Sequence, residues 1–192
     1  MKRLIIQSLF ALLCMGSLQA QVPIQISLMD HSHSIGNHWF LGYAYNPAIM
    51  VGSEKILRSK GNHDLHLTAN LGFYHQTQSQ SAAFVNSEIG YRYRLQNWSA
   101  NARFGLGYAH TFYPGPVYEQ SGDLFVESNQ PGAPRLQTSL SMGVGYRLGA
   151  SATSPEIGLR YMVAVHSPLN LYTGIHQMVG LSFTFYPFQT RS

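Results

Sequence analysis

The strongest constraint on the fold is a two-residue period in side-chain character that recurs along most of the chain. Leu65, Leu67 and Leu71, for example, alternate with His66, Thr68 and other polar or small residues. Successive side chains of a β-strand point to opposite faces, so each such segment predicts a strand with one apolar and one polar face. The predicted strands cover residues 48–57, 64–76, 82–95, 98–113, 117–127, 135–148, 156–166 and 176–187. They exceed the roughly 5–6 residues typical of globular strands and match the roughly 9–11 residues of a tilted membrane-spanning strand.

The composition supports an all-β chain. Only 10% of the residues are charged, against about 25% in an ordinary soluble domain. Aromatic residues make up 12%, and there are 18 glycines but one cysteine, which excludes a disordered chain and a disulfide scaffold. The mean hydropathy of −0.08 is too low for a helical membrane protein. Membrane barrels remain, because their apolar and polar residues alternate.

The two faces of the predicted strands indicate which one points inward. The polar faces carry glycines such as Gly72, Gly105 and Gly143, which a narrow interior needs and a solvated surface does not. Aromatic residues lie on the apolar faces near strand ends, as in the girdles of membrane barrels; they are Trp98, Phe112, Phe73 and Tyr146. We therefore expect an antiparallel up-and-down transmembrane β-barrel of eight strands, with ten as the alternative. A soluble β-barrel or sandwich with the faces reversed is the competing interpretation.

The first 20 residues have the pattern of a secretory signal peptide. A basic start is followed by an apolar run over 4–15 and a small residue at Ala20, and the run is too short for a spanning helix. Lipidation at Cys14 is an alternative, although Leu13 is larger than the residue that normally precedes such a cysteine. We expect residues 21–46 to form a periplasmic N-terminal segment, with an extra strand as the alternative, and residues 47–188 to form the barrel.

The signal segment, the alternating strands and the aromatic-rich stretch 179–188 resemble the small, about eight-stranded outer-membrane β-barrel proteins of Gram-negative bacteria. In that family an aromatic closing strand is read by the assembly machinery and often ends the chain, whereas here four residues follow Phe188. The resemblance implies an integral protein of the cell outer membrane. Members include two lipid A-modifying enzymes, but the deacylase pattern of His and Ser two residues apart is absent from this sequence.

The polar faces predict an ion-pair network in the lumen. If Gln96 and Asn97 form a two-residue turn, Glu88 faces Gly105 and lies diagonally from Arg103. The same reasoning places Glu127 opposite Arg103 and Arg147 opposite Glu156. The predicted network consists of Glu54, His66, Glu88, Arg92, Arg94, Arg103, Glu127, Arg147, Glu156 and Arg160. Because eight strands enclose only enough space for side chains, we expect a filled polar core rather than a channel.

Candidate metal ligands are few. His31, His33 and His38 follow one another closely beside Asp30, and imidazole with carboxylate suits zinc or copper; a plain polar segment is the simpler interpretation. We expect no cofactor and no catalytic residue. Nucleic acid is not an expected partner, because no basic stripe exists and the formal charge of +4 includes Lys2 and Arg3 of the leader.

These features favour a structural or accessory protein of the outer membrane that packs with other envelope components. The expected partners are outer-membrane lipid, lipopolysaccharide and other outer-membrane proteins. The alternatives are a lipid A-modifying enzyme and a small ligand- or metal-binding accessory to an outer-membrane transporter. An even strand number places both termini in the periplasm, with the outer loops then expected at 58–63, 96–97, 128–134 and 167–175.

Overall fold

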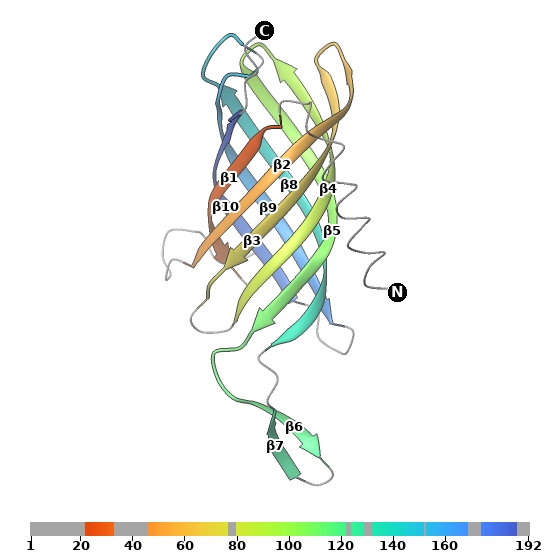
Figure 1. Cartoon of the computed structure of the whole chain (residues 1–192), viewed down its shortest axis with the longest axis vertical. Helices are drawn as coiled ribbons and strands as arrows, with labels where there is room; N and C mark the ends of the chain where they lie inside the picture. The colour runs from red at the N-terminus through yellow and green to blue at the C-terminus, as the bar shows by residue number, and fades with distance from the viewer. Residues whose placement is uncertain are drawn as a thin grey trace.

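The chain folds into ten antiparallel strands in a computed structural model that describes residues 22–32, 46–76, 80–121, 124–128, 132–151, 153–168 and 174–187 (Figure 1). The strands are β1 (Ile24–Ser32), β2 (Pro47–Lys60), β3 (His63–Tyr74), β4 (Ser81–Leu95), β5 (Trp98–Phe112), β6 (Val117–Ser121), β7 (Leu124–Ser128), β8 (Ala133–Arg147), β9 (Glu156–Pro168) and β10 (Gly174–Phe185). The leader predicted at residues 1–20 lies outside the described residues. The described part contains no helix long and apolar enough to cross a membrane.

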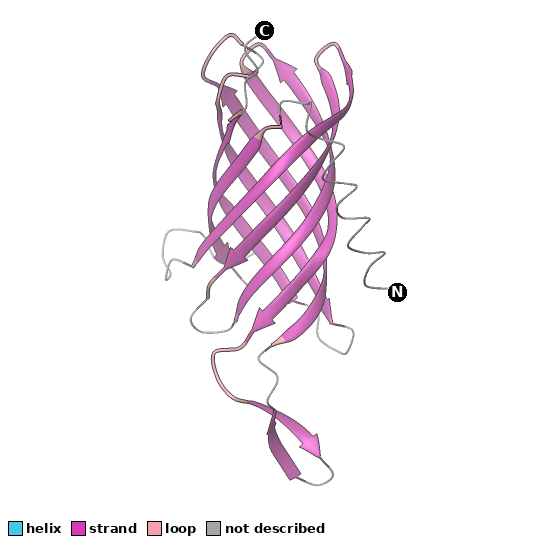
Figure 2. Cartoon of the chain, in the orientation of Figure 1, coloured by secondary structure: helices cyan, strands magenta, loops and turns pink. Residues whose placement is uncertain are grey.

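Eight strands close into one barrel, in the order β1-β10-β9-β8-β5-β4-β3-β2. Every neighbouring pair is antiparallel, and the ring closes where β1 pairs with β10, from Ile24 opposite Phe185 to Ser32 opposite Gln177. Strands and connecting loops make up the whole described chain (Figure 2). The sequence-based prediction of an eight-stranded, up-and-down antiparallel barrel is confirmed.

Two members of the ring differ from the prediction. The predicted strand 117–127 is not in the barrel, because β6 and β7 pair only with each other and β5 pairs directly with β8. The N-terminal segment supplies the missing strand as β1, so the barrel begins before residue 47. The inward face of β1 consists of Gln25, Ser27, Met29 and His31. This short alternation is the sequence signal for the extra strand, which is the alternative given above for residues 21–46.

The two ends of the barrel are unequal. Short turns at 61–62, 96–97 and 148–155 lie at the end that also holds the start of β1 and the finish of β10. The other strand ends lie at the opposite end, at Ser32 and Pro47, Tyr74 and Ser81, Phe112 and Ala133, and Pro168 and Gly174, and the β6–β7 hairpin extends well beyond it (Figure 1). The expectation that 58–63 and 96–97 lie opposite the termini is therefore wrong, since adding β1 reverses the direction of every strand through β5. We call the two ends the terminus end and the hairpin end.

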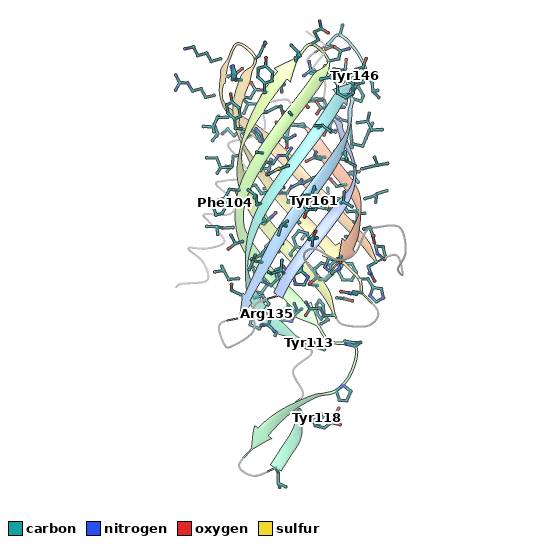
Figure 3. The ribbon with its side chains drawn as sticks, turned by 180° about the vertical axis from the view of Figure 1, so that it is seen from behind. Phe104, Tyr113, Tyr118, Arg135, Tyr146 and Tyr161 are labelled. Atoms are coloured by element: carbon teal, nitrogen blue, oxygen red, sulfur yellow. The ribbon has the colours of Figure 1, made fainter. Side chains whose placement is uncertain are left out.

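The barrel is apolar outside and polar inside. Leu71, Leu106 and Leu140 on the outer wall are 65%, 55% and 48% exposed, whereas His66, Glu88 and other polar side chains of the opposite face are buried. Figure 3 places Tyr146 near one end of the wall, Phe104 at mid-height and Tyr113 near the other end. The predicted aromatic residues near strand ends are all on the outer face, with Trp98 and Phe112 at opposite ends of β5. The faces of a soluble barrel would be reversed.

Glycines make room for the long polar side chains. A Cβ at Gly105 would lie 2.6 Å from both Glu88 Cγ and Ser139 Oγ, and one at Gly90 would lie 2.6 Å from Arg103 Cγ. Real Cβ atoms do not approach other atoms so closely, so these strand positions require glycine. The glycines on the polar face thus serve the narrow interior that the sequence predicts.

Candidate functional site in the lumen

The centre of the lumen is built around Glu88 of β4. This carboxylate is fully buried and accepts a hydrogen bond from Arg160 Nη2 of β9 at 2.6 Å. Hydroxyl and amide groups of neighbouring strands occupy its remaining positions at 3.2–3.3 Å; they belong to Thr68, Asn70, Ser139 and Ser141. A buried carboxylate with a cation and several donors is fully compensated, which suits a structural role.

The predicted neighbours of Arg103 are only partly correct. Glu88 faces Gly105 as the two-residue turn requires, but Arg103 Nη1 lies 4.0 Å from the Glu88 carboxylate, which Arg160 already binds. The prediction that Glu127 faces Arg103 is wrong, because Glu127 lies in β7, exposed and outside the ring. The actual partner of Arg103 on the next strand is Ser141. The error arises because the sequence-based prediction counts residues 117–127 as a strand of the barrel.

A second charged group lies nearer the terminus end. Arg92 of β4 donates from both terminal nitrogens to the Glu54 carboxylate of β2, at 2.7 Å for the Nη1–Oε1 pair. His66 Nε2 is 3.8 Å from the same carboxylate, as the sequence places these two residues near each other. Arg94 pairs with Asp64 at 3.1 Å, and this buried aspartate was not among the predicted network residues.

Arg147 and Glu156 face each other across β8 and β9, in the predicted register. Even so, Glu156 Oε1 accepts from Ser99 Oγ at 2.7 Å, and no ion pair of the described residues includes Arg147. The structure thus gathers nine of the ten predicted network residues inside the barrel; they are Glu54, His66, Glu88, Arg92, Arg94, Arg103, Arg147, Glu156 and Arg160.

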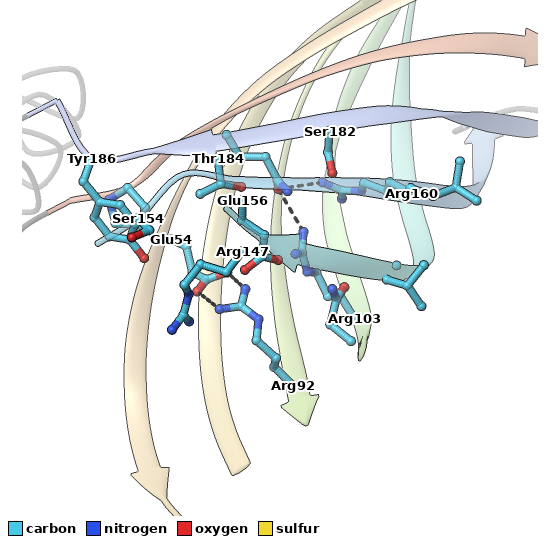
Figure 4. A pocket seen from close by; sticks show the side chains of 16 residues that line it. Glu54, Arg92, Arg103, Arg147, Ser154, Glu156, Arg160, Ser182, Thr184 and Tyr186 are labelled. Carbon is cyan, nitrogen blue, oxygen red and sulfur yellow. Dashed lines mark hydrogen bonds and ion pairs between the residues drawn. The ribbon is translucent and has the colours of Figure 1, made fainter. Parts of the chain in front are cut away.

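Gln25 of β1 links two of the guanidinium groups. Its side-chain oxygen accepts from Arg103 Nη1 at 3.2 Å and from Arg160 Nη1 at 3.3 Å, as Figure 4 shows by dashed lines. These residues border a cavity of about 20 Å³ whose lining also includes Arg92 and Arg147. Sequence reasoning missed Gln25 because β1 lay outside the predicted barrel.

An apolar layer lies between this polar half and the hairpin end. Its fully buried side chains come from six strands and are Met29, Met50, Phe84, Met162 and Met178, with Ala48, Ala82, Ala109 and Ala164. Met178 lies between Met162 of β9 and His31 of β1 in the sheet register. The seven methionines look scattered in the sequence, but the topology brings these four together. These side chains offer water no hydrogen bond, whereas the inner residues of β8 that pair with the layer are polar, with Ser139 opposite Ala164 and Ser141 opposite Met162.

A histidine cluster lies on the hairpin side of that layer. His31 stacks on Tyr74 with ring centroids 4.0 Å apart and contacts His176 at 2.9 Å between nitrogens. His166 lies 4.2 Å from His176, ring to ring, as the sequence suggests for these two residues. His33 and His38, the other candidate metal ligands, lie outside the described residues. Among the described side chains, no group of three His, Cys, Asp or Glu residues has an arrangement suited to a metal ion.

One further pair lies on the outer rim of the hairpin end. His75, just after β3, contacts Ser81 at the start of β4, with 2.8 Å between Nδ1 and Oγ. The pair is exposed. A histidine within hydrogen-bond distance of a serine hydroxyl is the minimal arrangement for a nucleophilic serine. No sequence pattern indicates this pair, because the geometry of the connection between the two residues cannot be read from their spacing.

Comparisons with known proteins agree with this architecture. Neisserial surface protein A has a TM-score of 0.56 at 10% identity, over 87% of this chain and 97% of that one. The outer membrane enzyme PagL has a TM-score of 0.52 at 9% identity, over 85% and 98%. This is the fold of the small outer-membrane β-barrels. No family model and no curated protein matches the sequence.

Proposed function

We propose that this chain is an integral outer-membrane protein that crosses the bilayer as a closed, non-conducting barrel and serves a structural or accessory role. The observation that carries the proposal is the polarity of the wall: large apolar side chains are exposed all around the ring while charged ones are buried inside. A protein in water would not expose an apolar band of this extent. A bilayer accepts it, because apolar side chains then meet acyl chains.

Exposed aromatic residues lie at two levels of the outer wall, one near each end of the barrel. At the terminus end Trp98 and Tyr146 contact each other edge to face, with ring centroids 5.0 Å apart, and both are exposed. At the hairpin end Phe73, Tyr108 and Phe112 are likewise exposed on the wall. Aromatic belts at both interfaces are typical of outer-membrane barrels, in which short turns face the periplasm and longer loops face outward. The hairpin would then project from the cell surface.

The hairpin favours a protein partner over lipopolysaccharide. Residues 114–132 include Glu119, Asp123 and Glu127 but no Lys or Arg, so the anionic sugar and phosphate surface would repel the segment. Tyr118 and Leu124 on the hairpin are 58% and 71% exposed. An acidic hairpin with exposed apolar side chains suits a basic protein surface. Extraction in mild detergent followed by affinity purification should recover such a partner with the wild type but not after deletion of residues 117–128.

Membrane embedding is tested by two arginine substitutions in β5 and β4. Leu106 and Leu95 are both on the outer wall and are 55% and 56% exposed, but Leu106 is near mid-strand and Leu95 ends β4. In a bilayer, Leu106→Arg should cost about 2–4 kcal/mol and Leu95→Arg about 0–1 kcal/mol. Urea unfolding of the protein folded into phosphatidylcholine vesicles measures both. Equal, small costs for the two variants would contradict a membrane-spanning wall.

The closed lumen is tested separately. The side chains of the methionine layer and of the ion pairs are buried in the interior, and an eight-stranded barrel encloses little more space than side chains occupy. The purified protein in planar bilayers should therefore show no steady conductance. Replacement of Met162 and Met178 by Ser and of Phe84 by Ala would open the layer and serves as the positive control. Steady single-channel current from the wild type would contradict the non-conducting barrel.

A second candidate function is lipid hydrolysis at the hairpin rim. The His75–Ser81 contact is the specific observation that favours it, since the outer-leaflet level is where lipid A esters would meet such a pair. Mass spectrometry of lipid A from cells expressing wild type or Ser81→Ala tests it. A deacylated species that depends on Ser81 would support an enzyme, and identical spectra would end this alternative without affecting the barrel proposal.

A further inference from the structure

The half of the lumen nearest the terminus end contains one more positive than negative group. Its inward-facing charged residues are Arg92, Arg94, Arg103, Arg147 and Arg160 against Glu54, Asp64, Glu88 and Glu156. Three guanidinium groups have a carboxylate partner, in the pairs Arg92–Glu54, Arg94–Asp64 and Arg160–Glu88. The two remaining arginines are Arg103 and Arg147, and the one remaining carboxylate is that of Glu156. One positive charge is therefore left without a counter-charge.

Arg103 is the more deeply placed of the two. It is 3% exposed, its contact with Glu88 is 4.0 Å long, and its hydrogen-bond acceptor is the neutral amide of Gln25. Its Nε has no hydrogen-bond partner among the described side chains. Glu156 is already bound by Ser99 Oγ. A buried cation without its own counter-charge is unfavourable, so the site has a strong reason to recruit an anion.

The cavity beside Arg103 offers space for one small ion. Four arginines line it, together with two carboxylates and the side chains of Ser182 and Thr184; the charged residues are Arg92, Arg103, Arg147 and Arg160 against Glu54 and Glu156 (Figure 4). Arg92 already binds Glu54 and Arg160 already binds Glu88, so the lining keeps a positive surplus. Its free volume is about 20 Å³, whereas one water molecule needs about 10–15 Å³. That space is large enough for a water molecule or a monatomic anion.

We propose that this cavity is a binding site for a single monovalent anion of the size of chloride, held by Arg103 and Arg147. One negative charge balances the surplus of the compartment, and guanidinium N–H groups and serine or threonine hydroxyl groups are suitable donors. Entry is from the terminus end, because Ser154 and Tyr186 of the lining lie beyond the strand ends there and the buried side chains of the methionine layer lie on the other side. The anion would complete the polar core, so binding should stabilise the folded barrel.

The test measures the thermal unfolding of the full chain in zwitterionic detergent as sodium chloride replaces sodium gluconate at constant ionic strength. The unfolding temperature should rise with the logarithm of chloride concentration and gain about 5–10 °C at 100 times the dissociation constant. Sodium bromide should act similarly. Arg103→Met should abolish the dependence, and Arg135→Met should keep it, because Arg135 bonds Tyr113 at the other end of the barrel.

A wild type with no chloride dependence, or an Arg103→Met variant with an unchanged dependence, would overturn the proposal. If Arg103→Met does not fold, wild-type crystals soaked in bromide decide the matter by anomalous diffraction. A peak between Arg103 and Arg147 supports the site. Its absence at saturating bromide means that water alone fills the cavity and overturns the proposal.

Discussion

Replacing Glu88 by Gln is the most revealing perturbation of the lumen. The change keeps the shape of the side chain but removes the charge that Arg160 binds at 2.6 Å. It also turns one of the two acceptor atoms into a donor, although the surrounding groups from Arg160, Thr68, Asn70 and Ser141 all donate to this carboxylate. The variant therefore leaves a buried guanidinium without a counter-charge and at least one donor without an acceptor.

The expected cost follows from these contacts. Breaking a buried ion pair by removing one partner costs about 3–5 kcal/mol. Because Glu88 is 0% exposed, solvent cannot replace the lost interaction. Arg103→Met should behave differently, because Glu88 retains Arg160 and its hydroxyl donors. That variant loses a hydrogen bond to Gln25, worth about 0.5–1.5 kcal/mol, and removes a cation without a close counter-charge. We expect its stability to lie within about 1 kcal/mol of wild type, the gain offsetting the loss.

Urea unfolding in the same detergent micelles and in chloride-free buffer measures the free energy of unfolding of wild type, Glu88→Gln and Arg103→Met. The heat-dependent gel mobility of the folded barrel is an independent measurement. Glu88→Gln should lie at least about 2 kcal/mol below Arg103→Met. Equal losses for the two variants would show that Arg103 and Arg160 share Glu88 evenly. A loss below about 1 kcal/mol for Glu88→Gln would refute the assignment of Glu88 as the centre of a dry, fully paired network.

Three other predictions concern the strands and turns. Gly105→Val should destabilise the barrel by about 1–3 kcal/mol, because its Cβ would lie 2.6 Å from atoms of Glu88 and Ser139. The control is Gly115→Ala, since Gly115 has open space around it, and urea unfolding measures both variants. Gln96 has a φ of 53°, so Gln96→Gly should be neutral or stabilise by up to about 1 kcal/mol; a clear loss would show that the Gln96 side chain contributes more than its backbone costs. Replacing residues 117–128 by a short Gly-Ser turn should leave the heat-dependent gel shift unchanged, because β5 and β8 pair without β6 and β7, whereas failure to fold would assign the hairpin a role in assembly.

Much of the barrel could be predicted from the sequence, because two-residue alternation is a local property. The turn at Gln96 and Asn97 determines the register of β4 on β5, and the structure pairs Glu88 with Gly105 as that turn requires. The same local reasoning correctly placed Arg147 opposite Glu156. Where a turn is short, the spacing of residues on its two sides determines which residues of the two strands pair.

The remaining features depend on non-local geometry. The connection between β5 and β8 is long, so spacing could not show that residues 117–127 leave the ring, and the misplaced Glu127 followed from that. The contact between Arg160 and Glu88 joins β9 to β4, two strands that are not neighbours in the sheet. Such contacts across the lumen depend on how the ring closes. The methionine layer was missed for the same reason.

The pairing of the first strand with the last has a consequence for how the protein is made. Ile24 bonds opposite Phe185, so the ring cannot close until almost the entire chain has been released. Until then β1 and β10 each expose an unpaired edge, which hydrocarbon does not tolerate. Contacts between distant parts of a chain also form slowly. If the barrel spans a bilayer as proposed, its insertion should therefore wait for the C-terminal strand, because a chain that lacks β10 leaves a strand edge unpaired in hydrocarbon.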